Sequence, residues 1–187
     1  MAVTVTFVEF NGATVEHSQG TAKANNLNFG NTDAANLVPA SYPVAAGSKA
    51  FAKFVQAQWS GSFTSITNAK LWLSAGALKS GESIMFSGSY SKITPAITAL
   101  PNVGAKAVPA VPSSQPASAN VAFAKSAARN TFTTTAGCVP NGGQALSSPG
   151  CYSGSRSSTM AIQLQTTGAI DAGAVNTKTF SLSYDRQ

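Results

Sequence analysis

Charged residues are scarce in this sequence. Aspartate, glutamate, lysine and arginine make up 10% of the 187 residues, whereas about 25% is usual for a soluble domain. Glycoside hydrolysis requires two carboxylates at a defined separation, and the six acidic residues of this chain form no evident pair. We expect the first two of them on solvent faces or at strand ends. The six are Glu9, Glu16, Asp33, Glu82, Asp171 and Asp185.

Motifs for nucleophilic, phosphate and metal chemistry are also absent. The single histidine, His17, has no GxSxG, P-loop or HExxH motif around it. A structural zinc ion needs four ligands, and two cysteines with one histidine cannot supply them. Asn31 and Asp33 lie in a calcium-like loop, but a single carboxylate there favours simple turn chemistry. We therefore expect no catalytic residue, no cofactor and no bound metal.

The basic residues do not form a patch. Twelve lysines and arginines give a net charge of +6, but even close neighbours such as Lys125 and Arg129 lie four residues apart. Nucleic-acid binders concentrate such residues on one face, so we expect no nucleic-acid partner. No apolar run approaches the ~20 residues of a membrane helix. The opening segment MAVTVTFVEFNG has no basic leader, which favours folding in the cytoplasm of the producing cell.

Apolar and polar residues alternate with a period of two, which predicts β-strands. The last strand shows this most clearly, because its apolar residues alternate with Thr, Ser and Asp. In the segment 50–60, Lys53 breaks the alternation. In the segment 65–76, Ile66 and Trp72 are expected on the face opposite Leu71. The residues predicted to point inward include Val3, Val5, Phe7, Phe51, Val55, Ala57, Trp59, Leu71, Leu73, Ile84, Phe86, Met160, Ile162, Leu164, Phe180, Leu182 and Tyr184.

Many short strands with one apolar face predict an all-β fold of two antiparallel sheets packed as a β-sandwich. The long separations between the first and last strands favour a jelly-roll-like or Greek-key topology. The first and last strands are expected to pair with each other. We predict one domain over residues 1–187 with long irregular loops.

Two of these loops are candidate contact surfaces. Residues 94–119 carry Pro101, Pro109 and Pro112, and prolines cannot supply a regular ladder of backbone donors. We expect this segment to form a loop or an arm that lies on a neighbouring chain. Residues 136–157 are rich in glycine and serine. Long ordered loops are often functional surfaces.

Both cysteines lie in the second loop. Cys138 and Cys151 enclose twelve residues, and a disulfide between them would contribute roughly 3 kcal/mol by restricting the unfolded chain. The alternative is a pair of reduced thiols, as is usual in a cytoplasmic protein. We expect the disulfide, formed after exposure to oxidising surroundings.

Exposed aromatic rings would offer a surface for partners or sugars. Trp59 is in phase with core residues, so we expect it to be buried. Trp72 points the opposite way from its apolar neighbours, and Tyr152 follows the second cysteine in a loop. With the prolines named above, Trp72 and Tyr152 are the candidate interface residues.

Several segments resemble small jelly-roll structural proteins of tailed bacteriophage particles. They are SITNAKLWLSAG, ESIMFSGSY, STMAIQLQTTGAIDAG and the closing TFSLSYDRQ. The resemblance covers about half of the chain, mainly 50–92 and 157–187. The proline-rich segment and the cysteine loop are not part of it.

The resemblance implies a virion component that acts by binding. The chain is similar to capsid decoration (cement) proteins. This similarity implies a homotrimer clamped on the major capsid protein or another virion protein. A neck, tail or baseplate attachment protein is the first alternative. A carbohydrate-binding adhesive sandwich is the second, and a sandwich enzyme such as a glycan depolymerase is the third. The resemblance supplies no catalytic residues, cofactor, nucleic-acid partner or membrane partner.

Overall fold

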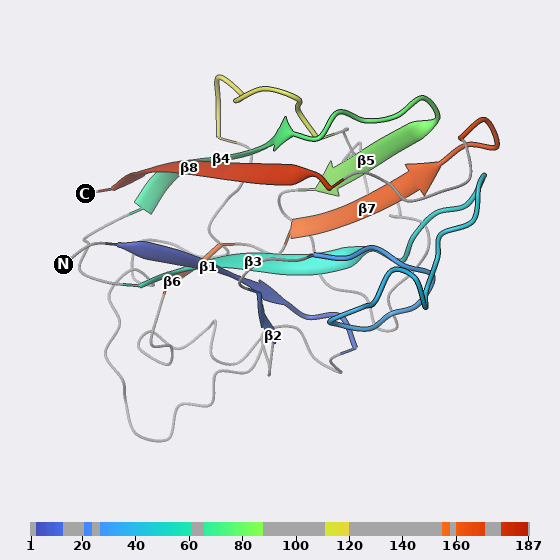
Figure 1. The fold of residues 1–187 in the computed structure, drawn as a ribbon. Helices are drawn as coiled ribbons and strands as arrows, with labels where there is room; N and C mark the ends of the chain where they lie inside the picture. The colour runs from blue at the N-terminus through green and yellow to red at the C-terminus, as the bar shows by residue number, and fades with distance from the viewer. Residues whose placement is uncertain are drawn as a thin grey trace, which may run out of the picture.

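The computed structural model contains strands, turns and loops but no helix in the residues that it describes. These residues are 3–12, 21–23, 27–60, 66–87, 111–119, 155–157, 160–170 and 177–186. Figure 1 shows the strands as two layers with loops extending from their ends. The strands are β1 (Thr4–Glu9), β2 (Thr21–Lys23), β3 (Lys53–Ser60), β4 (Ile66–Ala75), β5 (Glu82–Ser87), β6 (Ser155–Arg156), β7 (Met160–Thr166) and β8 (Thr179–Arg186).

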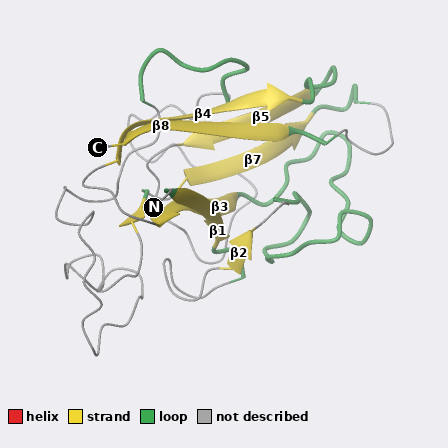
Figure 2. Ribbon diagram, turned by 60° about the vertical axis from the view of Figure 1, so that its left-hand side comes forward, coloured by secondary structure: helices red, strands yellow, loops and turns green. Residues whose placement is uncertain are grey.

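The strands form two antiparallel sheets, as predicted. Sheet A has the order β2-β1-β3-β7-β5, with β6 also paired to β3, and sheet B consists of β4 and β8. β7 comes late in the chain but lies between β3 and β5, so the topology is not a simple meander (Figure 2). The expected pairing of the first and last strands is wrong. β1 belongs to sheet A and β8 to sheet B, because each strand finds a partner from the middle of the chain.

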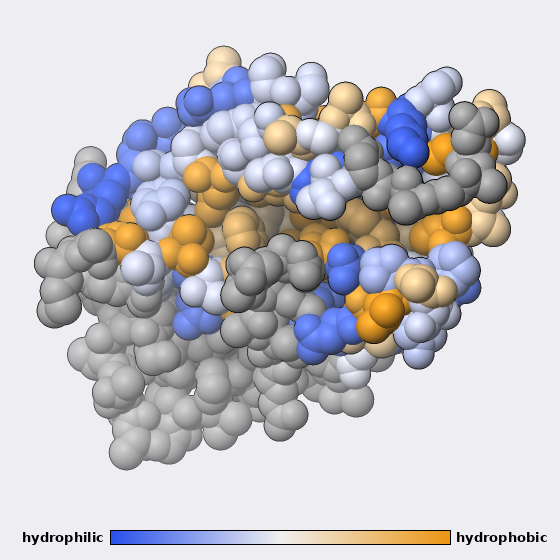
Figure 3. Space-filling view, in the orientation of Figure 1, coloured by the Kyte–Doolittle hydropathy of each residue, from blue (hydrophilic) through white to orange (hydrophobic). Residues whose placement is uncertain are grey.

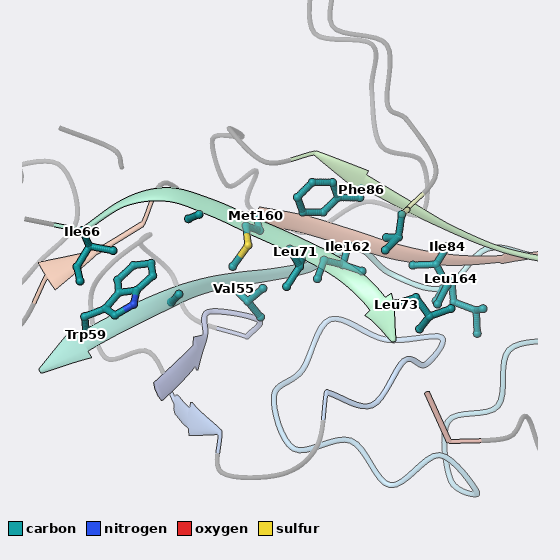
Figure 4. Close-up of a cluster of buried hydrophobic side chains, with 14 residues drawn as sticks. Val55, Trp59, Ile66, Leu71, Leu73, Ile84, Phe86, Met160, Ile162 and Leu164 are labelled. Carbon is teal, nitrogen blue, oxygen red and sulfur yellow. The ribbon is translucent and has the colours of Figure 1, made fainter. Parts of the chain in front are cut away.

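The main core lies between the two sheets, where the alternating apolar residues meet (Figure 4). The β7 residues Met160, Ile162 and Leu164 are at most 6% exposed, and Trp59 of β3 is fully buried. Burial of one such side chain contributes roughly 1.5–3 kcal/mol. The remaining buried members are Ala50, Val55, Ala57, Ile66, Ala69, Leu71, Leu73, Ile84, Phe86 and Val111.

The last strand joins this core through its predicted inward residues. Phe180, Leu182 and Tyr184 all pack against the buried cluster, although each is only partly buried. The rings of Tyr184 and Trp59 meet edge to face, with centroids 5.5 Å apart and planes at 82°. Such a pair adds roughly 0.5–1.5 kcal/mol beyond the burial of its area. β8 is therefore attached to sheet A through side chains and to β4 through its backbone.

The opposite face of sheet A is buried as well, which alternation did not predict. Phe10, Phe54 and Ala161 belong to a second apolar cluster with Val8, Ala52 and the partly buried Phe51. Two glutamine side chains on this sheet, Gln56 and Gln163, are fully buried. The amide of Gln163 donates to the carbonyl of Ala50 at 2.9 Å, which satisfies a polar group that would be costly to bury alone.

The expected orientation of Ile66 in β4 is wrong, because a β-bulge turns its side chain to the inner face. Ile66 was expected to share a face with Trp72, but it is 1% exposed and belongs to the main core. The pairing with β8 shifts register between Thr67 and Lys70, and Asn68 has a φ of 52°. An extra residue in one strand reverses the alternation beyond it. Ile66 therefore points inward on one side of the bulge while Leu71 points inward on the other.

The described end of the proline-rich segment attaches to the sandwich. Residues 111–119 contain no strand, as expected of a loop. The amide of Val111 donates to the Ile84 carbonyl at 2.9 Å, and the amide of Leu73 donates to the Pro112 carbonyl at 2.8 Å. Val111 is 8% exposed and belongs to the main core. This part of the predicted arm therefore bridges β5 and β4 of its own chain.

We predict that Val111→Ala lowers the free energy of unfolding by about 2 kcal/mol, because it removes buried methyl groups and leaves a cavity. Chemical denaturation measures the change. Ser114→Ala, at an exposed position of the same segment, is the matched control and is expected to leave stability unchanged. Equal stability of Val111→Ala and the wild type would show that residue 111 does not belong to the core.

Candidate functional site

A buried ion pair connects the first strand to the start of β3. The ammonium of Lys53 lies 2.8 Å from Glu9 Oε1, and the two side chains are 0% and 1% exposed. The same ammonium donates to the carbonyl of Ala34 at 2.8 Å. Glu9 lies opposite Val55, and Phe7 opposite Ala57, so the carboxylate projects on the core face of β1. Glu9 was expected on a solvent face or at a strand end. It is the last residue of β1, but it is buried and does not face solvent, because a lysine on the neighbouring strand neutralises it.

A second buried pair holds the start of β5 to the start of β8. The Lys178 ammonium lies 2.7 Å from Glu82 Oε1, and their side chains are 7% and 0% exposed. The backbone amide of Lys79 donates to Glu82 Oε2 at 2.9 Å. Both ends of the carboxylate are therefore engaged within the chain.

The other two described carboxylates are bound by asparagines. Asp33 Oδ1 accepts from Asn11 Nδ2 at 2.9 Å and from the Gly12 amide at 3.1 Å. Asn11 in turn donates to the Ala52 carbonyl at 2.7 Å and accepts from the Phe54 amide at 2.9 Å. This asparagine is 4% exposed and ties the loop before β3 to the end of β1. The turn role expected of Asp33 thus extends to a hydrogen-bonded connection between strands.

Each of the four described carboxylates is held by residues of its own chain, since Asp185 Oδ2 also accepts from Asn68 Nδ2 at 3.0 Å. General acid–base catalysis needs a carboxyl group within hydrogen-bond reach of a substrate, and the two buried ones are enclosed by their lysines. Among the described residues, no group of three or more His, Cys, Asp or Glu side chains is placed to hold a metal ion. Within the same residues, no helix has the length and hydropathy needed to cross a membrane.

The structure describes two of the predicted interface residues. Trp72 lies opposite Ser181 in the β4–β8 ladder and is partly exposed, between the buried Leu71 and Leu73. Pro112 is also partly exposed, and its carbonyl is bonded to β4. Trp72 and Pro112 therefore lie on sheet B and its covering loop. Cys138, Cys151, Tyr152, Pro101 and Pro109 fall outside the described residues, and so does the predicted disulfide.

The free edge of β8 is a feature that alternation alone did not reveal. The outer edges of β4 and β5 meet residues 111–112, as described above. β8 pairs with β4 along one edge, and in the described ranges no backbone group pairs with its other edge. An antiparallel strand directs alternate N–H and C=O groups to each side. Among the described residues, the N–H and C=O groups of β8 (Thr179–Arg186) that point away from β4 thus have no backbone partner.

Apolar side chains accompany this edge. Phe180, Leu182 and Tyr184 are only partly buried, and Val5 of β1 is 36% exposed beside Trp59 in the β1–β3 ladder. In Figure 3, hydrophobic residues line a recess between the layer that carries β8 and the layer that carries β1. Residues 179–184 of this strand lack the usual protection of an edge, because they contain no proline and no charge, and the charged Asp185 and Arg186 stand only at its end.

The combination of backbone groups and partly exposed apolar side chains suits a protein partner better than a small molecule. An added strand would satisfy the backbone row and cover the apolar residues at once. The alternation of residues 179–185 identified β8 only as a core strand. The signal for the edge lay in its composition, TFSLSYD, which has strong β propensity without the lysine or proline of a guarded edge. No protein-family model, no curated protein and no solved structure matches the chain.

Proposed function

We propose that this chain is a structural protein of a bacteriophage particle, most plainly a capsid decoration protein, and that it acts by binding without catalysis. The observation that carries the proposal is the open edge of β8, with the half-buried Phe180, Leu182 and Tyr184 beside it. The engagement of all four described carboxylates within the chain supports a binding role. The resemblance of the β4, β5, β7 and β8 segments to phage jelly-roll proteins supports the virion setting.

The physical task is the burial of surface between neighbouring subunits. A specific interface buries about 800 Å² on each partner, and added strand pairing contributes hydrogen bonds that a flat surface does not offer. The partner in this proposal is the major capsid protein or another virion protein. A neck, tail or baseplate position would use the same contact chemistry.

Density-gradient fractionation of particles from cells that make the chain tests this proposal. We expect the chain to sediment with the particles, at a fixed ratio to the capsid protein, by quantitative mass spectrometry. Particles that carry none of the chain, while the chain stays at the top of the gradient, would contradict the virion role. Electron microscopy of the loaded particles separates a capsid position from a tail position.

A carbohydrate-binding role is the rival that the partly exposed Trp72 supports. Stacking of a sugar on this ring would make Trp72→Ala, and with it Tyr152→Ala, abolish selective binding on a glycan array. We expect no selective binding by the wild-type chain. Selective binding that both substitutions abolish would replace the virion proposal by the carbohydrate one.

A further inference from the structure

The sequence of β8 reads nearly the same in both directions. Around Leu182, the residues are Thr-Phe-Ser on one side and Ser-Tyr-Asp on the other. Reversal therefore matches serine with serine, phenylalanine with tyrosine, and threonine with aspartate. Antiparallel pairing of two identical strands reverses one of them, so this strand is chemically matched to a second copy of itself.

We propose that β8 pairs with β8 of a second copy about a two-fold axis at Leu182, which joins the two copies of sheet B into one sheet. A two-fold contact uses the same patch on both copies. The pairing supplies the backbone groups that the free edge of β8 lacks in the described chain. The inference deepens the proposed function and rests on it for the role in a particle, although the pairing itself needs no particle.

The core face of the joined strands is complementary in this register. Leu182 lies opposite Leu182 of the second copy, and Phe180 lies opposite Tyr184. Aromatic and aliphatic pairs directly across two strands stabilise a sheet. All three side chains are only partly buried in the single chain, so the pairing covers apolar surface that is otherwise exposed.

The outer face and the strand ends are complementary as well. Ser181 lies opposite Ser183, and the hydroxyl of Thr179 lies opposite the carboxylate of Asp185. Only Lys178 and Arg186 bring like charges together. The Lys178 ammonium is already neutralised by Glu82 at 2.7 Å, which reduces the repulsion at each end.

The two-fold contact closes at two copies, in contrast to the trimer that the phage resemblance implies.

Light scattering and analytical ultracentrifugation of the purified full-length chain test the pairing. We expect a concentration-dependent mass that rises to twice the 19.0 kDa of one chain. The double variant Ser181→Lys with Ser183→Lys places two like-charged pairs across the two-fold axis and is expected to weaken the dimer by about tenfold. Both serines lie on the outer face, and their hydroxyl contacts with Ser74 and Gln115 are exposed, so the fold is expected to persist.

A charge-exchange variant tests the register. Ser181→Lys with Ser183→Glu places opposite charges across the axis at Leu182 and is expected to dimerise at least as tightly as the wild type. A two-fold axis at residue 181 or at residue 183 would place that substituted residue opposite its own copy. Like charges would then meet, and the variant would dimerise less tightly than the wild type. The matched control, Ala40→Lys with Ser41→Lys in the exposed loop before β3, adds the same charge outside sheet B and is expected to leave the dimer unchanged.

A wild-type chain that stays monomeric at all concentrations would overturn the pairing, as would a trimer. Equal dimerisation of the double-lysine variant and the wild type would also overturn it, with circular dichroism confirming that each variant is folded. Failure of the proposed function gives a different result. In that case the chain dimerises in solution but does not sediment with particles.

Discussion

Glu9→Gln is expected to lower the free energy of unfolding by about 3–5 kcal/mol, because it leaves the Lys53 ammonium buried without its counter-ion. The two groups lie 2.8 Å apart and are essentially inaccessible to water. A typical domain is stable by only about 5–15 kcal/mol, so much of the margin is lost. For a chain of this size the midpoint of thermal unfolding is expected to fall by on the order of 10 °C. Calorimetry and denaturant titration measure the change.

Two comparisons isolate the ion pair. Glu9→Leu combined with Lys53→Met removes both charges and keeps apolar volume, and it is expected to recover most of the lost stability. Asp185→Asn removes an exposed carboxylate bonded to Asn68 and is expected to change stability by less than about 1 kcal/mol. A Glu9→Gln protein as stable as the wild type would contradict the buried pair. A specific loss of enzymatic turnover with stability intact would instead favour a sandwich enzyme.

Trp59→Ala is expected to cost about 3–5 kcal/mol, which is the usual cost of truncating a large buried aromatic side chain. The ring is fully buried, lies beside Ile66 at one end of the cluster (Figure 4), and meets Tyr184 of β8 with ring centroids 5.5 Å apart. Its loss therefore weakens the attachment of β8 to sheet A as well as the core itself. Hydrogen exchange of the β8 amides is expected to rise together with the loss of global stability.

Trp72→Ala is the matched control, since it removes the same side chain from the outer face of sheet B. Trp72 is only partly buried, and its truncation is expected to cost about 1 kcal/mol or less. Equal losses of stability from the two substitutions would contradict the assignment of Trp59 to the core and of Trp72 to the outer face. A larger loss at Trp72 would place the core on the other side of sheet B.

The alternation of side chains predicted the two-sheet fold and most of the main core, but not the second apolar cluster or the exposure of Val5, which was expected to point inward. Met160, Ile162 and Leu164 follow a strict period of two, and all three are buried. Their strand has no competing pattern, so burial on one face determines its orientation. Phe180 and Tyr184 were identified in the same way, and both pack against the core. Local pattern is informative here because each strand has one strongly apolar face.

The buried ion pair was missed because a charge was read as an interruption of the pattern. Glu9 continues the series Val5 and Phe7, and Lys53 precedes Val55 with the same spacing. Each charged residue therefore has an apolar phase, and their opposite signs were a usable signal. The two are 44 residues apart in the chain, so their pairing depends on the β1–β3 register, which no local pattern specifies. The bulge at Asn68 was missed for a related reason, because one inserted residue leaves no mark in the composition.

In the proposed dimer, β8 combines two roles that are usually separate in a sandwich. Its apolar face contributes to the core through Tyr184 and Leu182, while the edge away from β4 pairs with no backbone group of the residues that the structure describes. The ladder with β4 holds it along its length, Lys178 bound to Glu82 holds its start, and Tyr184 packed on Trp59 holds its end. The strand is thus fixed in position before a partner arrives, which lowers the conformational entropy lost on binding.

Hydrogen exchange of the backbone amides of residues 179–186, measured at low and at high protein concentration and again on particles, tests the binding role of this edge most directly. We expect alternate amides of β8 to become protected as the chain assembles, while the amides that pair with β4 are protected throughout. If assembly protects another surface and leaves the β8 amides unchanged, the edge of β8 is not where this protein binds.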